Sequence, residues 1–306
     1  MTFGAISNPA FLIRYRSYDI KHQNLYMLTN HHTHSLYSDG SSQPEEYITE
    51  AIARGFHILG FTEHSPLPFE NTFSFKKGNK EEYVSLIQTL KQKYSPEIAI
   101  YSGMEMDYIP GMSENFSKTK SEYKLDYLIG SVHLVKPENN EELWFTDGPD
   151  YRTYDKGLNE LFDSDIKKAV SRYYRQLNEM IESQQFDIIG HFDKIKMHNQ
   201  DRFFKEDEPW YLALINETLD LLQDRDIIVE INTRGIYKQR SETTYPGLDI
   251  LKQIKKLRIP VMVNSDAHKP HELDGEFGYG FSILKEAGIN EVVYFKGNGW
   301  GFEEIK

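Results

Sequence analysis

The segment HHTHSLYSDG, residues 31–40, places three histidines and an aspartate within ten positions. His32 and His34 form an H-x-H pair. Alternate residues of an extended strand project to the same side, so both imidazoles can reach one metal ion. Taken alone, such a pair could equally lie at the surface or cap a helix. Its meaning depends on what the rest of the chain places beside it.

Similar polar residues recur along the chain, at the end of short apolar runs or just beyond them. The motifs are TEH after Leu59, GMEMD after Ile100, GSVH after Leu128, GHFD after Ile188 and NSDAH after Val261. With the first segment they supply nine candidate metal ligands: His32, His34, Asp39, His64, Glu105, His133, His191, Asp266 and His268. Nine ligands exceed the needs of one ion. Two or three ions that share a carboxylate such as Glu105 can use them all.

The apolar runs alternate with helix-like segments. Strands are expected at residues 28–32, 58–62, 98–105, 127–133, 187–191, 227–232 and 259–264, with 292–295 as a late candidate. Residues 44–56 and 165–184 have the pattern of helices. Such alternation favours βα units around a parallel sheet, either closed as a barrel or open. In a closed barrel the strand ends meet on one face, so the candidate ligands would share one volume.

Composition limits the classes of function. A chain of 306 residues with 39% hydrophobic content can bury a large core. Its net charge of −12 argues against extended nucleic-acid contacts, and no stretch has the length and apolarity of a membrane span. The absence of cysteine restricts any metal site to nitrogen and oxygen ligands and fits a cytoplasmic location. We expect an N-terminal extension at residues 1–26 and a single domain at 27–306.

The ordered series HHTHS, FTEHS, GMEMDYIPG, GSVH, GHFDKIK, EINTRG and NSDAH resembles the polymerase and histidinol phosphatase (PHP) superfamily, in particular its L-histidinol-phosphate phosphatases. The resemblance implies an α/β fold, a distorted (β/α)7 barrel of the PHP type, as the catalytic domain. It also implies a trinuclear centre of zinc, manganese or iron, held by the nine residues above. Some members of the superfamily have a histidine where this chain has Asp39. An aspartate at this position resembles the pattern of the phosphatase branch.

This resemblance implies a histidinol-phosphatase, which hydrolyses L-histidinol phosphate to L-histidinol and phosphate in histidine biosynthesis. We expect a hydroxide bridging two divalent ions to attack phosphorus in line, with catalytic roles for Glu105, Asp266 and His268. The leaving alkoxide would take its proton from a metal-bound water or from Asp266. Arg234 is the main candidate for binding the phosphate, because a guanidinium matches phosphate geometry, and Lys238 and Arg202 are weaker ones.

Two alternatives remain open on the sequence. One is a PHP phosphoesterase for another small monoester, such as a nucleotide or sugar phosphate. The other, disfavoured by the acidic balance, is a metal-dependent exonuclease. Loops at residues 68–78, 108–116 and 144–155 contain carboxylates and aromatic rings that could select the substrate. The sequence leaves the identity of the metal and the oligomeric state open.

Several acidic residues and histidines lie near these motifs without fitting a ligand position. We expect Glu63, Asp107 and Asp193 to orient ligands through hydrogen bonds. The histidines that fit no ligand position are expected to be structural or exposed to solvent: His22, His57, His198 and His271.

Overall fold

The computed structural model describes residues 26–306, and seven parallel strands form its centre. Their order in the sheet is β1 (Thr29–Asn30), β2 (Ile58–His64), β3 (Ala99–Asp107), β4 (Tyr127–Ser131), β7 (Ile188–Ile189), β8 (Ile228–Asn232) and β9 (Val261–Asn264). A parallel bridge between Thr33 and Ala267 joins the first strand to the last. His34 N donates to Ala267 O at 2.8 Å, just beyond both strands. The sheet is therefore a nearly closed barrel, as the resemblance implied.

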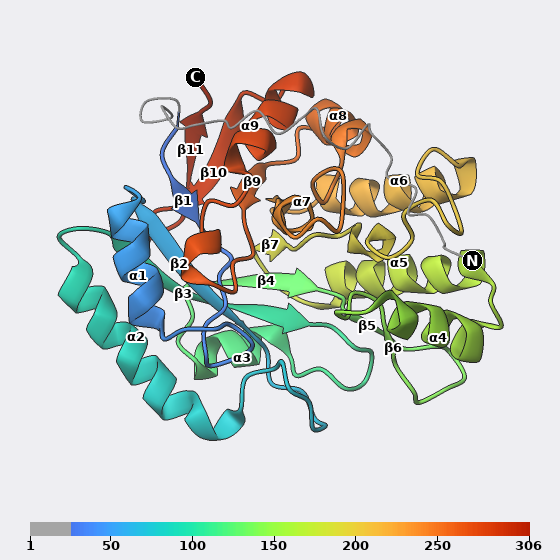
Figure 1. Cartoon of the computed structure of the whole chain (residues 1–306), viewed down its shortest axis with the longest axis horizontal. Coiled ribbons are helices and arrows are strands. Elements are labelled where there is room, and N and C mark those ends of the chain that lie inside the picture. The colour runs from blue at the N-terminus through green and yellow to red at the C-terminus, as the bar shows by residue number, and fades with distance from the viewer. Residues whose placement is uncertain (1–25) are drawn as a thin grey trace, which may run out of the picture.

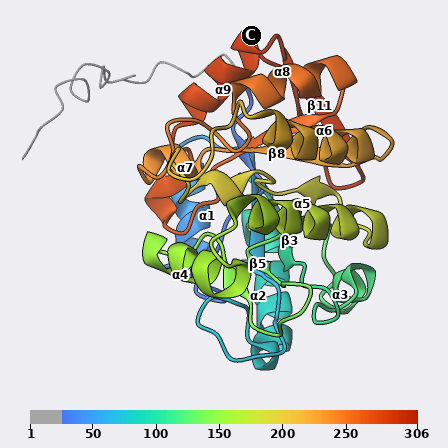
Figure 2. The same cartoon turned by 90° about the vertical axis from the view of Figure 1, so that its right-hand side faces the viewer.

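Helices surround the barrel on the outside (Figures 1 and 2). They are α1 (Pro44–Ala53), α2 (Lys80–Tyr94), α3 (Phe116–Glu122), α4 (Tyr151–Phe162), α5 (Ile166–Ser183), α6 (Pro209–Gln223), α7 (Arg234–Tyr237), α8 (Leu248–Leu257) and α9 (Phe277–Glu286). The α5 sequence illustrates why they form. Asp165 caps its N-terminus by accepting from Lys168 N, and apolar residues at three- and four-residue spacing are buried along one side. None of the helices described is long and apolar enough to cross a membrane.

A short hairpin lies between β4 and α4 and consists of β5 (Leu134–Val135) and β6 (Trp144–Phe145). A second hairpin, of β10 (Glu291–Phe295) and β11 (Trp300–Glu304), covers the N-terminal end of the barrel. Val293 and Phe295 pack there against a buried cluster of barrel residues: Tyr127, Ile129, Ile188, Ile228 and Met262. With this end plugged by apolar side chains, the opposite end is left for polar residues.

The strands and helices predicted from the sequence are present in the structure, but each differs from its predicted range in its first residue, its last residue or both. All seven expected barrel strands are present, and residues 292–295 do form a strand, though it belongs to the hairpin and not to the barrel. The two expected helices are α1 and α5. Residues 1–25, nearly all of the expected N-terminal extension, and with them His22, lie outside the described part of the chain.

Candidate metal centre

The candidate ligands lie at the C-terminal ends of the barrel strands. His64 is the last residue of β2, Glu105 lies near the end of β3, and His133 follows β4 by two residues. His191 and Asp266 follow β7 and β9 with positive φ values of 20° and 52°, a backbone conformation that is unusual for residues other than glycine. Such conformations are often retained where they aim a side chain into a functional site.

The structure brings all nine candidate ligands together. Their nitrogen and oxygen atoms form four groups, each with its atoms within 4.8 Å of one another. The groups are His34, Asp39, His64 and His268; His32, His191 and Asp266; His32, His34 and Glu105; and His64, Glu105 and His133. Because four of the nine residues belong to two groups, the groups form one connected cluster and not separate sites.

Glu105 lies at the middle of this cluster. Its Oε1 is 2.9 Å from His191 Nε2 and 3.4 Å from His133 Nε2. Its Oε2 is 3.2 Å from His64 Nδ1 and 3.3 Å from His32 Nε2. The two oxygens therefore face different histidines, which is the arrangement a carboxylate needs to bridge two ions.

Pairs of imidazole nitrogens also point at each other. The Nε2 atoms of His32 and His34 lie 3.0 Å apart, and those of His133 and His191 lie 3.3 Å apart. Among the described residues, Asp266 Oδ1 is buried without a hydrogen-bond partner. Buried polar atoms rarely remain unsatisfied. The donor set of imidazoles and carboxylates fits zinc, iron or manganese, and a shared cation would satisfy these atoms.

The charges within the cluster are strongly coupled. Burial alone would lower the pKa of His32, but Glu230, Glu105 and Asp266 hold it well above its usual range. Burial would raise the pKa of Glu105, but His32, His133 and His64 hold it well below. Burial likewise opposes the carboxylates around His64, among them Glu105 and Asp39, which raise its pKa to about 9. For these three groups the attraction between imidazoles and carboxylates therefore outweighs the effect of burial on the pKa.

Comparison with known proteins identifies the family. Residues 30–234 match the PHP domain. The chain belongs to the PHP domain family. A probable histidinol-phosphatase of Deinococcus radiodurans is 27% identical over 87% of this chain and 96% of that protein. The histidinol-phosphatase of Bacillus subtilis is 24% identical over 79% of this chain and 91% of that protein.

Two solved structures resemble the PHP domain described here. A putative histidinol phosphatase of Listeria monocytogenes aligns with a TM-score of 0.72 at 21% identity, covering 82% of this chain and 99% of that chain. The histidinol phosphate phosphatase of Lactococcus lactis, solved with zinc, L-histidinol and phosphate, aligns with a TM-score of 0.64 at 22% identity. That alignment covers 89% of this chain and 98% of that chain. These likenesses confirm the expected (β/α)7 barrel.

Carboxylates behind the histidines of the PHP domain fix how their rings lie. Glu230 Oε1 lies 2.6 Å from His32 Nδ1, and its Oε2 accepts from His191 N at 3.0 Å. Asp107 contacts His133 Nδ1, as expected for an orienting residue. Glu63 accepts from the Ser35 and Ser38 hydroxyls, which flank the His34 loop.

The remaining expected positions differ from one another. Asp193 forms an ion pair with Lys196 at 2.9 Å, so it contacts a lysine and not one of the candidate ligands. His57 and His271 are exposed, as expected. His198 donates from Nε2 to Gly148 O at 2.7 Å, which is a structural role.

The sequence motifs did not single out Glu230 as an orienting residue, although it lies in the quoted motif EINTRG. The available signal was a carboxylate inside an apolar strand, two residues from Asn232 and therefore on the same side of the strand. Both residues are fully buried, and Asn232 Nδ2 donates to Glu230 Oε2 at 3.0 Å.

We expect Glu230→Gln to weaken metal binding by about 10- to 100-fold, the usual effect of removing such a partner. The glutamine keeps the size of the side chain but loses the charge that holds His32 and its hydrogen bonds. Competition with a chelator of known affinity would measure the change. Glu291→Gln, on the exposed start of β10, is the matched control. Equal affinities of the two variants would contradict the role of Glu230.

Three cations lie close to this cluster. Arg234 donates from Nη1 to Asp266 O at 2.7 Å, and its Nε is 4.0 Å from Asp266 Oδ2. Lys194 Nζ is 3.0 Å from Asp147 Oδ2 and 3.7 Å from Asp266 Oδ2. Lys238 lies farther out and donates to Glu272 at 2.6 Å. Lys194 and Asp147 were not assigned from the sequence, although Lys194 lies in the quoted motif GHFDKIK.

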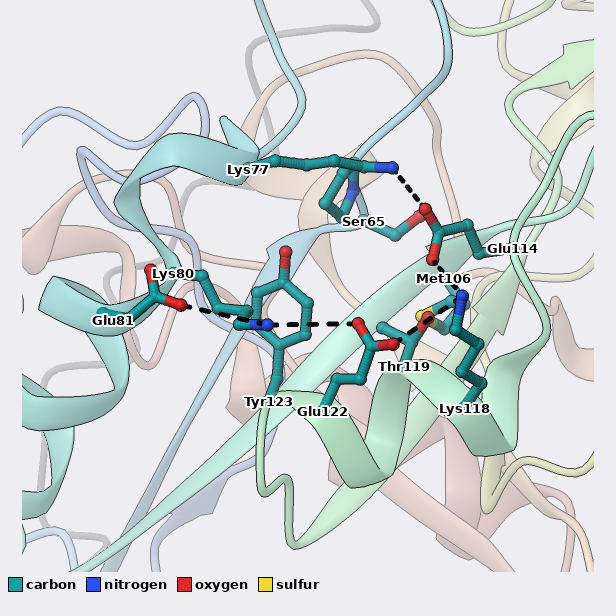
Figure 3. A pocket seen from close by; sticks show the side chains of 11 residues that line it. Ser65, Lys77, Lys80, Glu81, Met106, Glu114, Lys118, Thr119, Glu122 and Tyr123 are labelled. Carbon is teal, nitrogen blue, oxygen red and sulfur yellow. Dashed lines mark hydrogen bonds and ion pairs between the residues drawn. The ribbon is translucent and has the colours of Figure 1, made fainter.

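A separate cavity of about 180 Å³ lies outside this cluster, between the start of α2 and α3 (Figure 3). Ser65 and Met106 line it beside three lysines and three glutamates: Lys77, Lys80, Lys118, Glu81, Glu114 and Glu122. These charged side chains pair with one another, as Lys118 does with Glu122 at 3.7 Å. None of the nine candidate ligands lines this cavity, so it is separate from the candidate metal centre.

Proposed function

We propose that this PHP domain is a metal-dependent phosphomonoesterase that hydrolyses L-histidinol phosphate to L-histidinol and phosphate. The observation that carries the proposal is the convergence of nine candidate ligands, seven of them buried, around Glu105 at the barrel mouth. The relatives named histidinol-phosphatase support this choice of substrate, as does the Lactococcus lactis structure with L-histidinol and phosphate. We also propose a cytoplasmic location, because the chain has no cysteine and so none of the disulfides that are common in proteins of oxidising compartments.

We propose that the nine residues hold two or three divalent ions, of zinc, manganese or iron. Bound ions would lower the pKa of water from 15.7 towards about 7 and neutralise the phosphoryl oxygens. Glu105 is suited to bridge two of them, because its two oxygens face different histidines. His268 lies between two carboxylates, 3.2 Å from Asp39 and 3.4 Å from Asp266, so its imidazole is held in place from both sides.

Arg234 is proposed to bind the phosphate. Burial alone would lower its pKa, but Asp266, Tyr237 and Glu272 raise it, so the guanidinium remains charged. Its side chain is 13% exposed and lies against Asp266 at the edge of the cluster. Lys238 is a weaker candidate, because Glu272 already engages its ammonium and a phosphate would have to compete for it.

Lys194 is a further proposed contact for the substrate. Its pKa would fall with burial, but Asp147, Asp266 and Glu105 raise it, so the ammonium carries a proton at neutral pH. Asp266, by contrast, has a pKa held well below its usual range against burial, by His32, Arg234 and Lys194. We therefore propose Lys194, whose Nζ lies 3.7 Å from Asp266 Oδ2, as a further source of the proton for the leaving alkoxide, beside Asp266 and a metal-bound water.

The decisive assay compares phosphate release from L-histidinol phosphate with release from a nucleotide, a sugar phosphate and single-stranded DNA, with the metal content measured in the same preparation. The proposal predicts the highest kcat/KM on L-histidinol phosphate and two or three ions per chain. Faster turnover of another monoester would make the protein a phosphoesterase of different specificity. Cleavage of the DNA alone would contradict the proposal.

Removing the ions is expected to destabilise the fold. A ligand at 100 times its Kd adds about 2.7 kcal/mol to the free energy of unfolding, which corresponds to a Tm shift of about 5–10 °C in a large domain. We therefore expect treatment with a chelator to lower Tm by at least about 5 °C, and added zinc or manganese to restore it. Calorimetry before and after dialysis measures this. An unchanged Tm, with no ions found in the untreated protein, would contradict the ligand assignment.

A further inference from the structure

Two partly exposed phenylalanines, Phe73 and Phe145, lie beside the candidate metal centre and have no role in holding it. Their rings stack with centroids 5.7 Å apart and planes at 28°. The Phe73 ring also meets the His64 ring edge-on, with centroids 5.5 Å apart. The pair, called here the aromatic wall, therefore begins directly at a candidate metal ligand and extends away from it.

Separate parts of the chain fix each ring of the aromatic wall. Asn71 Oδ1 accepts from Phe73 N at 3.1 Å and from Ser74 N at 2.7 Å, which sets the turn that presents Phe73. Phe145 belongs to β6 and pairs with Leu134 in the hairpin that follows β4. Gly148 lies close behind it, since a Cβ there would come within 3.3 Å of the Phe145 ring. Two loops from different strands thus converge to hold two rings at the mouth.

We propose that the aromatic wall binds the flat ring of the leaving group and so selects aromatic phosphomonoesters. This inference rests on the proposed function, because it requires the phosphoryl group to lie at the candidate metal centre. With the phosphoryl group at the candidate metal centre, a leaving group that extends past His64 would meet the partly exposed Phe73 ring. An imidazole can stack on or meet edge-on a phenyl ring, which stabilises the contact beyond the area it buries.

Another exposed aromatic pair does not offer such a surface. Tyr151 and Phe203 both lie under the Arg202 guanidinium, whose central carbon is 5.4 and 4.7 Å from their ring centroids. Asp155 holds that guanidinium through two hydrogen bonds, at 2.8 and 2.9 Å. These rings therefore already have a partner, whereas the aromatic wall contacts only itself and His64 among the ring pairs of residues 26–306.

The test uses Phe73→Leu, Phe145→Leu and the double variant, which keep an apolar side chain but remove the ring. Phe302→Leu, on β11 at the far end of the barrel, is the matched control because Phe302 is 60% exposed. Four substrates separate the features of the ligand. L-histidinol phosphate has a ring and an amine, phenethyl phosphate only a ring, phosphoethanolamine only an amine, and glycerol phosphate neither.

We expect the double variant to lose about tenfold in kcat/KM on the two ring-bearing substrates, the size of one or two aromatic contacts. Its kcat/KM on the other two substrates should stay within about threefold of the wild type, as should all four values for Phe302→Leu. Equal losses on all four substrates would overturn the inference, since they would indicate a structural role. So would a double variant that keeps the wild-type preference.

The same experiment distinguishes this inference from the proposed function. A wild-type protein that hydrolyses L-histidinol phosphate no faster than glycerol phosphate would contradict the proposed substrate, whatever the variants do. A wild-type protein that prefers L-histidinol phosphate, with variants that share this preference, would contradict only the aromatic wall.

Discussion

Glu105→Ala is expected to lower kcat/KM on L-histidinol phosphate by at least about 10³-fold and to remove one or more ions. Glu105 is the residue whose two oxygens face four histidines, so its loss leaves both sides of the cluster without their shared carboxylate. Metal ions contribute several kcal/mol to stabilising such a transition state, and each 1.36 kcal/mol is a factor of ten. Elemental analysis and phosphate release, on the same sample, measure the two effects.

Two further variants make this result interpretable. Glu105→Gln keeps the shape of the side chain and removes only its charge, so it should fold even where the alanine variant does not. Glu97→Gln, at the exposed turn before β3, should keep both the ions and the activity. A Glu105→Gln protein with full metal content and wild-type kcat/KM would show that Glu105 is not a bridging ligand.

Arg234→Ala is expected to lower kcat/KM by about 10²- to 10³-fold while leaving the metal content unchanged. Removing one donor that stabilises transition-state charge typically has an effect of this size. Arg234→Lys should recover only part of the activity, because an ammonium cannot contact two phosphoryl oxygens in the fork geometry of a guanidinium. Steady-state kinetics, with inhibition by inorganic phosphate as a second readout, measure both variants.

Arg225→Ala, on an exposed turn after α6, is the matched control and should behave as the wild type. If Arg234→Ala loses ions together with activity, Arg234 supports the ligand Asp266 and does not bind phosphate. If inorganic phosphate inhibits Arg234→Ala as strongly as it inhibits the wild type, the proposed contact between Arg234 and the phosphate is wrong.

The candidate ligands could be predicted because metal-binding side chains are conspicuous at the ends of apolar strands. His133 and His191 each follow a run of apolar residues, and parallel strands bring such ends to one edge. The alternation of elements alone did not decide between an open sheet and a barrel. Closure depends on the bridge from Thr33 to Ala267, a contact between residues more than 200 positions apart that no local pattern encodes.

The partners behind the ligands were harder to predict. Glu230 is a buried carboxylate whose signal was its place inside an apolar strand, whereas the buried Lys194 resembles in sequence the many lysines that face solvent. Asp193 was expected to orient a ligand but pairs with Lys196, because its position in the turn after β7 aims it at that lysine. The packing of the loops at the barrel mouth decides which charged side chains pair with each other. That packing arises only once the barrel has formed.

Anomalous X-ray diffraction from crystals of the full chain, purified without chelators in the presence of zinc or manganese, tests the shared metal centre most directly. We predict two or three anomalous peaks at the barrel mouth, with the two Glu105 oxygens bound to different peaks and the nine ligands distributed among all of them. Peaks held by a different set of side chains, or a barrel mouth with no metal at saturating ion concentration, would contradict this prediction.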